Sequence, residues 1–120
     1  MPRRFLAILA ATLWAAAASA AGTFFNTVED MPLMPGLAEA PGASTVFDKA
    51  EGRIVQLVAS GRVQGTEVLK FYGEALPQLG WSKAADGSWR RENELLRLEV
   101  KPKGRDSELH ISIAPSRTSR

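Results

Sequence analysis

Three glutamates lie close together toward the C-terminal end of the chain: Glu92, Glu94 and Glu99. Glu92 and Glu94 share a face if they belong to one regular strand, and paired carboxylates perform general acid–base catalysis when burial separates their pKa values. Arginines are interleaved with these glutamates, which favours solvated ion pairs between neighbouring strands instead. We therefore predict no catalytic residue and keep a hydrolase that uses Glu92 and Glu94 only as a third hypothesis.

The other residue types that commonly carry chemistry are too few or wrongly spaced. His110 is the only histidine and the chain has no cysteine, whereas a zinc site needs three or four protein ligands. No Gly-x-Ser-x-Gly or Ser-x-x-Lys sequence marks a nucleophilic serine, and no Lys-Ser/Thr pair follows Gly61 or Gly65 to form a phosphate-binding loop. The sequence predicts a non-enzymatic protein with no metal and no cofactor.

Aromatic and basic side chains are the remaining candidates for binding. Tyr72, Trp81 and Trp89 have large apolar ring faces that can stack on a sugar or a peptide. Tyr72 and Trp81 are expected in the core, whereas Trp89 flanks a turn in a charged strand and is expected to contact a ligand or partner. The predicted binding residues lie in the sheet and in the N-terminal arm: Trp89, Arg91, Arg97, Leu33 and Met34.

One helix is the clearest element that must position these residues. Thr66 is expected to cap a helix beginning at Glu67, which places an acidic side chain at the positive end of the helix dipole. Pro77 lacks an amide hydrogen and is expected to kink or end the helix near Leu76, and Gly80 is expected to adopt the left-handed conformation that reverses the chain. Apolar residues at helical spacing predict one buried stripe: Val68, Leu69, Tyr72, Ala75, Leu76 and Leu79.

Strand-forming runs lie on both sides of this helix in the sequence. A hairpin is expected from Thr45–Lys49 and Arg53–Ser60. Four further runs follow the helix: Trp81–Ala84, Ser88–Asn93, Leu95–Lys101 and Glu108–Ala114. Apolar and polar residues alternate in the last two, so one sheet face is expected in the core and the other in water. The prediction is an α+β fold, with one amphipathic helix packed on an antiparallel sheet, in the order β-β-α-β-β-β-β after an irregular N-terminal arm.

The chain length suits one packed domain, preceded and followed by less regular segments. Residues 21–44 contain Pro32, Pro35 and Pro41, which prevent a sustained helix or central strand and predict an irregular arm. The apolar middle of this arm is expected to pack on the domain; the alternative is a free strap that binds a partner. Residues 45–115 form the expected single α+β domain, and residues 116–120 are expected to be a disordered tail.

The first 20 residues have the pattern of a signal peptide. Arg3 and Arg4 precede an apolar run over residues 5–18, and Ala18 and Ala20 supply the small residues that a signal peptidase requires. The run is too short to cross a bilayer, which takes roughly 20 helical residues. We expect cleavage of residues 1–20 and a periplasmic mature protein, with an uncleaved N-terminal anchor as the alternative.

The excess of positive charge belongs to this leader. The whole chain has 15 Lys and Arg against 13 Asp and Glu, and removal of Arg3 and Arg4 leaves 13 of each. A balanced charge supplies no general affinity for nucleic acid, so no nucleic-acid partner is predicted. Because the chain has no cysteine, a packed core and not a disulfide framework has to stabilise the exported domain.

The helix and the strand after it contain the pattern Phe-Tyr-x-x-x-Leu-Pro-x-x-Gly-Trp over residues 71–81, followed by a turn and a charged hairpin. Residues 31–37, 47–48 and 52–54 form the approach to it. Together these segments cover most of residues 31–115 and resemble small bacterial exported proteins and lipoproteins of uncharacterised function. The resemblance implies a helix packed on an antiparallel sheet in a periplasmic protein. It implies no activity, because it brings no catalytic residues.

These observations predict a non-enzymatic periplasmic module that binds another envelope or periplasmic protein. Its expected contact surfaces are the sheet face from Arg90 to Lys101 and the arm over residues 31–37. The alternative is a carrier of a small ligand in a cleft between the helix and the sheet. No integral membrane span is expected after leader cleavage, and the exposed sheet edges favour a monomer or a weak dimer.

Overall fold

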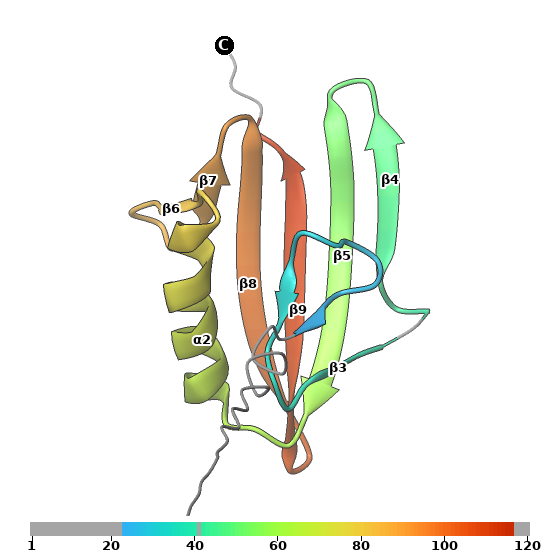
Figure 1. Cartoon of the computed structure of the whole chain (residues 1–120), viewed down its shortest axis with the longest axis vertical. Coiled ribbons are helices and arrows are strands. Elements are labelled where there is room, and N and C mark those ends of the chain that lie inside the picture. The colour runs from blue at the N-terminus through green and yellow to red at the C-terminus, as the bar shows by residue number, and fades with distance from the viewer. Residues whose placement is uncertain (1–22, 41, 117–120) are drawn as a thin grey trace, which may run out of the picture.

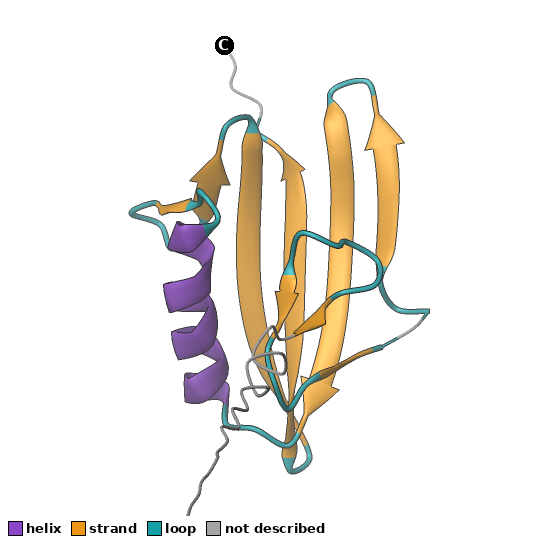
Figure 2. Ribbon diagram, in the orientation of Figure 1, coloured by secondary structure: helices purple, strands orange, loops and turns teal. Residues whose placement is uncertain are grey.

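The computed structural model describes residues 23–40 and 42–116, and their fold is α+β as predicted. Figure 2 shows the helix of this part of the chain beside a large sheet. After the arm, the elements follow the predicted order β-β-α-β-β-β-β. In chain order they are β1 (Thr23–Phe24), β2 (Pro32–Leu33), β3 (Ala38–Glu39), β4 (Thr45–Lys49), β5 (Gly52–Gly61), α2 (Gly65–Gln78), β6 (Ser82–Lys83), β7 (Trp89–Arg91), β8 (Glu94–Lys103) and β9 (Asp106–Pro115).

The main sheet is antiparallel throughout and has the strand order β3-β5-β9-β8-β7-β6, with β4 also paired to β5. β4 pairs with the first half of β5 and β3 with its last residues, so both form the same edge of the sheet. The long strands β5, β8 and β9 lie side by side in the centre (Figure 1). In the arm, β1 and β2 form a separate antiparallel pair with two residues in each strand.

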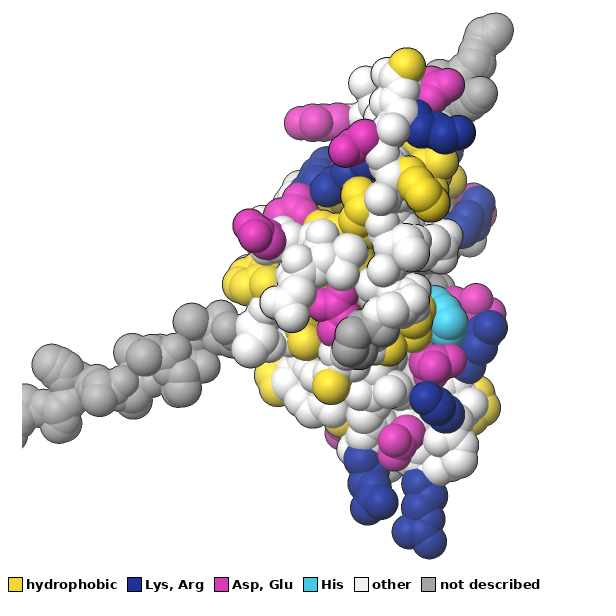
Figure 3. Space-filling view, turned by 90° about the vertical axis from the view of Figure 1, so that its right-hand side faces the viewer, with side chains coloured by type: hydrophobic (Ala, Val, Ile, Leu, Met, Phe, Trp, Pro, Cys, Tyr) yellow, Lys and Arg dark blue, Asp and Glu magenta, His cyan; other side chains and the backbone are white. Residues whose placement is uncertain are grey.

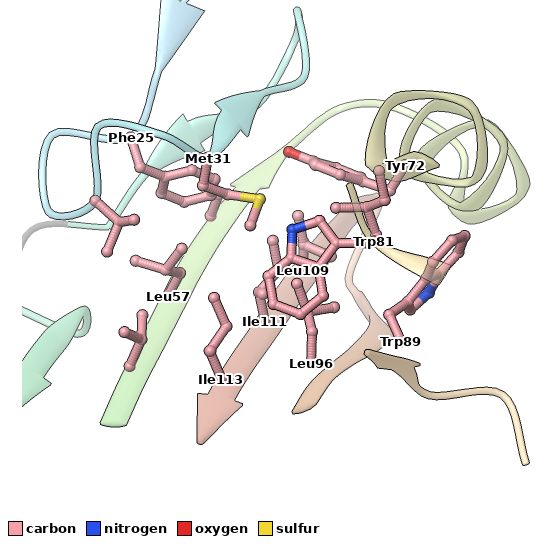
Figure 4. Packing of buried hydrophobic residues seen from close by; sticks show 14 of the residues in the cluster. Phe25, Met31, Leu57, Tyr72, Trp81, Trp89, Leu96, Leu109, Ile111 and Ile113 are labelled. Carbon is pink, nitrogen blue, oxygen red and sulfur yellow. The ribbon is translucent and has the colours of Figure 1, made fainter. Parts of the chain in front are cut away.

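One face of this sheet, here called the covered face, packs against both α2 and the arm. Its side chains alternate along β5 and β9: Val55, Leu57, Ala59, Leu109, Ile111 and Ile113, all fully buried. The helix contributes Val68, Tyr72 and Leu76, and the arm contributes Phe25 and Met31. Figure 4 shows these two contributions meeting over the strands. The core is therefore one continuous layer shared by three parts of the chain.

The arm packs on the domain, as expected from its apolar middle. Val28 and Leu37 are buried in addition to Phe25 and Met31, and the arm is irregular apart from three two-residue strands. The predicted leader over residues 1–20 and most of the predicted disordered tail over 116–120 lie outside the described residues. No helix within residues 23–40 and 42–116 combines the length and apolarity needed to span a membrane.

The start of the helix differs from the prediction. α2 begins at Gly65, with Gln64 as an N-cap in extended conformation and no side-chain capping bond, so the prediction of a Thr66 cap was wrong. The first helical hydrogen bonds already run from the amides of Glu67 and Val68 to the carbonyl of Gln64, at 3.0 and 3.1 Å. Thr66 is therefore inside the helix, and the chain at Gly65 passes close to β8, since a Cβ atom there would lie 3.3 Å from Val100 Cγ1.

The end of the helix follows the expected signals, with one shift. Pro77 lies in the last turn and α2 continues to Gln78, two residues beyond the predicted kink or end near Leu76. Proline is tolerated there because it removes only one hydrogen bond close to the helix end. Gly80 has φ +95° as predicted, and the amide of Trp81 donates to the carbonyl of Leu76 at 3.1 Å.

The buried stripe of the helix is narrower than predicted. Val68, Tyr72 and Leu76, spaced four residues apart, are fully buried. Leu69 is 50% exposed, so its inclusion in the stripe was wrong. Successive residues of a helix are rotated by about 100°, which turns Leu69 away from the sheet when Val68 faces it.

The strand that was expected over Ser88–Asn93 ends earlier. β7 stops at Arg91, and Glu92 has φ +54° in the tight turn that leads into β8. Glu92 and Glu94 therefore do not share the face of one regular strand, because the chain reverses between them. The reversal was missed because Glu92 is a residue type that seldom adopts positive φ.

Candidate functional site

The second face of the main sheet, here called the open face, has no covering helix or arm among residues 23–40 and 42–116. The register places its central residues opposite one another across β5, β9 and β8: Gln56, Val58, Ser112, His110, Arg97 and Glu99. Gln56, Arg97 and Glu99 are exposed. Figure 3 turns the β4 edge toward the viewer and shows the histidine on one side with acidic and basic side chains around it.

Charged side chains on β8 and β9 give the open face its electrostatic character. Glu108 Oε2 lies 3.5 Å from Nζ of Lys103, and Glu108 Oε1 lies 3.0 Å from Nε2 of His110. The hydrogen bond with His110, and the charge of Lys103, lower the pKa of Glu108. Arg97 and Lys101 form no ion pair with any other described residue. Glu99, which lies between them on β8, forms none either, so this row of the open face carries two basic groups and one acidic group without an ion-pair partner among the described residues.

The predicted binding residues are not brought together. Arg97 is exposed on the open face, whereas Trp89 is 4% exposed and belongs to the core of the covered face. Burial of Trp89 leaves almost none of its ring to contact a ligand or partner. Leu33 and Met34 are partly buried and pack against the same core. Of these four residues, only Arg97 is exposed.

Arg91, the fifth predicted binding residue, is engaged within the molecule. Its guanidinium carbon lies 4.4 Å from the ring centroid of Trp81, and its Nη1 donates to the carbonyl of Leu79 at 3.1 Å. Nη2 of Arg91 also lies 3.4 Å from Glu94 Oε1 and 3.5 Å from Asp30 Oδ2. These contacts hold the end of α2 against β7 and leave the side chain of Arg91 23% exposed.

A second arginine completes this charged cluster at one end of the covered face. Arg53 Nε donates to Glu94 Oε2 at 2.7 Å, and Arg53 Nη2 lies 3.7 Å from Asp30 Oδ2. The hydrogen bond to Glu94 raises the pKa of Arg53. Two guanidinium groups and two carboxylates thus connect the arm, β5, β7 and β8. Asp30 and Arg53 are too far apart in sequence for spacing alone to reveal the cluster.

Tyr72 attaches the arm to the helix. Its hydroxyl donates to the carbonyl of Pro32 at 2.7 Å and accepts from the amide of Met34 at 3.1 Å. Burial raises the pKa of Tyr72, so the phenol stays protonated and continues to donate. The arm is therefore held by a hydrogen-bonded side chain in addition to its apolar contacts.

Three surface hollows have volumes of about 630, 440 and 290 Å³. The first lies beside the helix start and is lined by Arg62, Val63, Gln64, Gly65, Glu67, Arg105 and Ser107. The other two lie beside the arm. The first hollow lies where the start of α2 meets the sheet, because Gly65 and Glu67 belong to α2 and Ser107 belongs to β9. In the described part of the chain, no group of three or more histidine, aspartate and glutamate side chains is placed to hold a metal ion.

Glu39 organises the smallest of these hollows. Its carboxylate accepts hydrogen bonds from the amide of Asn26, at 2.7 Å, and from the hydroxyl of Thr27. Burial alone would raise the pKa of Glu39, but these hydrogen bonds outweigh it and lower the pKa below its ordinary value of 4.5. The charged form of Glu39 therefore stabilises the folded arm.

A pH titration of stability tests this role of Glu39. Because the folded-state pKa is lowered, the stabilisation is complete above pH 4.5 and is lost as the pH falls through the lower folded-state value. We expect Glu39→Gln to lower the free energy of unfolding above pH 4.5, and this loss to shrink as the pH falls below 4.5. Urea unfolding of both proteins at several pH values measures this difference, and a difference that does not change with pH contradicts the assignment.

Comparison of the chain with known proteins gives no match, whether to a protein-family model, to a curated protein or to a solved structure. The resemblance of the pattern over residues 71–81 to small exported proteins of bacteria stays a prediction. The function has to rest on the surfaces and clusters described above.

Proposed function

We propose that the protein is an exported, non-enzymatic module that binds another protein of the cell envelope through the open face of its sheet. One observation carries this proposal: α2 and the arm both pack on the covered face, and nothing within residues 23–40 and 42–116 packs on the other. A sheet in a two-layer fold needs only one covered face for stability. The second face is therefore available for binding.

The chemistry of the open face favours a partner with an acidic surface. Arg90 and Arg97 are exposed on β7 and β8, and Lys101 continues the same row along β8. None of these three side chains forms an ion pair with another described residue. Complementary charges at an interface raise the association rate and specify the partner more than they raise affinity.

The arm is a weaker candidate for the contact surface. Met31 is 1% exposed and Leu37 is 7% exposed, and the hydroxyl of Tyr72 binds the backbone on either side of Leu33. A free strap would require these contacts to break. The ligand carrier and the enzyme have less support: the hollow where α2 meets β9 is lined mostly by polar side chains, and Glu94 is bound by two arginines.

Site-specific crosslinking in cells tests the proposal. A photoreactive residue at position 56, in the centre of the open face, is expected to capture one defined protein in the periplasmic fraction, whereas a probe at Lys70 on the exposed side of α2 is not. Arg97→Glu is expected to reduce this capture about fivefold or more, because it reverses a charge at the contact. Lys70→Glu makes the same change of charge elsewhere and is expected to leave capture unchanged.

The same preparation reports on export. N-terminal sequencing of the accumulated protein is expected to begin at Ala21, which corresponds to removal of the predicted leader. Equal capture through positions 56 and 70, or capture that is insensitive to Arg97→Glu, contradicts binding through the open face.

A further inference from the structure

β4 is an unprotected edge strand. All five of its residues are exposed. They include two large apolar residues, Val46, which is 39% exposed, and Phe47, which is 59% exposed. β4 pairs with β5 on one side only, and no described strand pairs with its outer side. Figure 3 looks at this edge of the molecule and shows hydrophobic side chains at the surface. Unpaired backbone groups on such a strand can accept a strand from another chain.

The opposite edge of the sheet differs in this respect. It ends in β6, of two residues, and β7, of three, and α2 lies along the β8 side (Figure 1). Very short edge strands and a covering helix are common protections against edge-to-edge pairing. The β4 edge has neither, although two charged residues lie at one end of the strand.

We propose that β4 pairs antiparallel with β4 of a second copy of this chain, around a two-fold axis that passes between the two Phe47 residues. This register is the one that pairs all five residues of β4 with all five of its copy. Phe47 then lies opposite Phe47, Thr45 opposite Lys49, and Val46 opposite Asp48. The strand is thus complementary to itself, with an aromatic pair at the centre and no like charges directly opposed.

Neighbouring registers are less favourable, which makes the proposal specific. A shift of two residues one way places Asp48 opposite Asp48, and like charges in directly opposed positions are destabilising. The same shift the other way places Val46 opposite Val46 but pairs only three residues of β4 with β4. An isologous interface of this kind closes as a dimer and does not extend into a filament.

The dimer would join two sheets edge to edge. A two-fold axis that pairs two edge strands antiparallel in a continuous sheet is perpendicular to that sheet, so the open faces of both copies point the same way. The contact is one short strand pair, about 17 Å long, and small interfaces of this size are weak. We expect a reversible dimer with a dissociation constant on the order of 10 µM. The inference does not depend on the proposed partner of the open face.

Sedimentation equilibrium measures the association. The chain is expressed from residue 1, and the protein that accumulates in the cells is purified. This protein is expected to show a monomer–dimer equilibrium. Phe47→Lys places two like charges on the two-fold axis and is expected to weaken the dimer at least about tenfold. Leu69→Lys is the matched control, because it replaces another half-exposed apolar residue, on α2, and is expected to leave the equilibrium unchanged.

Single-cysteine variants test the register, since the native chain has no cysteine. Directly opposed residues of antiparallel strands have Cα atoms about 4.5–5.5 Å apart, within the range of a disulfide. Phe47→Cys is expected to form a disulfide-linked homodimer, and an equimolar mixture of Thr45→Cys and Lys49→Cys a mixed dimer, whereas Leu69→Cys stays monomeric. A monomer at all concentrations, a dimer insensitive to Phe47→Lys, or a β4 edge that crosslinks only to a different protein overturns the proposal.

Discussion

Gly61→Ala is expected to lower the free energy of unfolding by about 3 kcal/mol and to loosen the arm from the sheet. A Cβ atom on Gly61 would lie 1.9 Å from the carbonyl oxygen of Gly36 and 2.9 Å from its carbonyl carbon. Both are main-chain atoms and cannot rotate away as a flexible side chain can. Gly36 itself has φ +98°, and a Cβ there would lie 2.8 Å from Val63, so this stretch of the arm has little freedom to adjust.

Urea unfolding gives the stability of Gly61→Ala, and hydrogen exchange of the arm amides shows whether the arm has separated. Gly73→Ala is the control: a Cβ on Gly73 would meet nothing within 4 Å, and the residue is exposed on α2. Alanine is favoured over glycine within a helix by about 1 kcal/mol, so this variant is expected to be more stable than the wild type. Equal, small effects of the two substitutions would show that the arm does not approach β5 closely.

Leu76→Ala is expected to lower the free energy of unfolding by about 2–5 kcal/mol. Leu76 is a fully buried residue of α2. Its carbonyl accepts hydrogen bonds from the amides of Leu79 and Trp81, in the turn that ends the helix. Truncation removes apolar contacts and leaves a cavity beside Trp81 and Tyr72, which belong to the same cluster. The range reflects how far the surrounding side chains relax into the cavity.

Leu69→Ala is the matched control for that prediction, because it makes the same chemical change on the same helix at a residue that is 50% exposed. We expect its effect to stay within about 0.5 kcal/mol. Chemical denaturation of both variants, monitored by tryptophan fluorescence, measures the two effects. A similar loss of stability at positions 69 and 76 is the result that the packing of α2 does not allow.

Much of the architecture was predictable because it depends on local patterns. β4 lies over the predicted residues 45–49, and the alternation along β8 and β9 correctly identifies Leu109, Ile111 and Ile113 as core residues. The spacing of Val68, Tyr72 and Leu76 and the glycine at position 80 likewise follow from helical periodicity and from the conformational freedom of glycine. Each of these signals needs only residues that are close in the sequence.

The binding candidates were less predictable because a side chain has the same type whether its surroundings bury it or not. Trp89 and Arg91 belong to the covered face, where the core and the cluster around Glu94 take up both side chains. Arg97 points to the open face, six residues after Arg91. Which face each residue takes depends on the turn at Glu92, which resets the alternation between β7 and β8.

The fold class, the order of the elements and the alternation that makes one sheet face apolar follow from residue periodicity, so they can be derived from the amino-acid sequence without coordinates. Long-range packing places the arm and the helix on that same face, and leaves the open face and the β4 edge uncovered by residues 23–40 and 42–116. Those outcomes depend on contacts between segments far apart in the chain, such as Tyr72 with Pro32 and Gly61 with Gly36, and no local pattern encodes them.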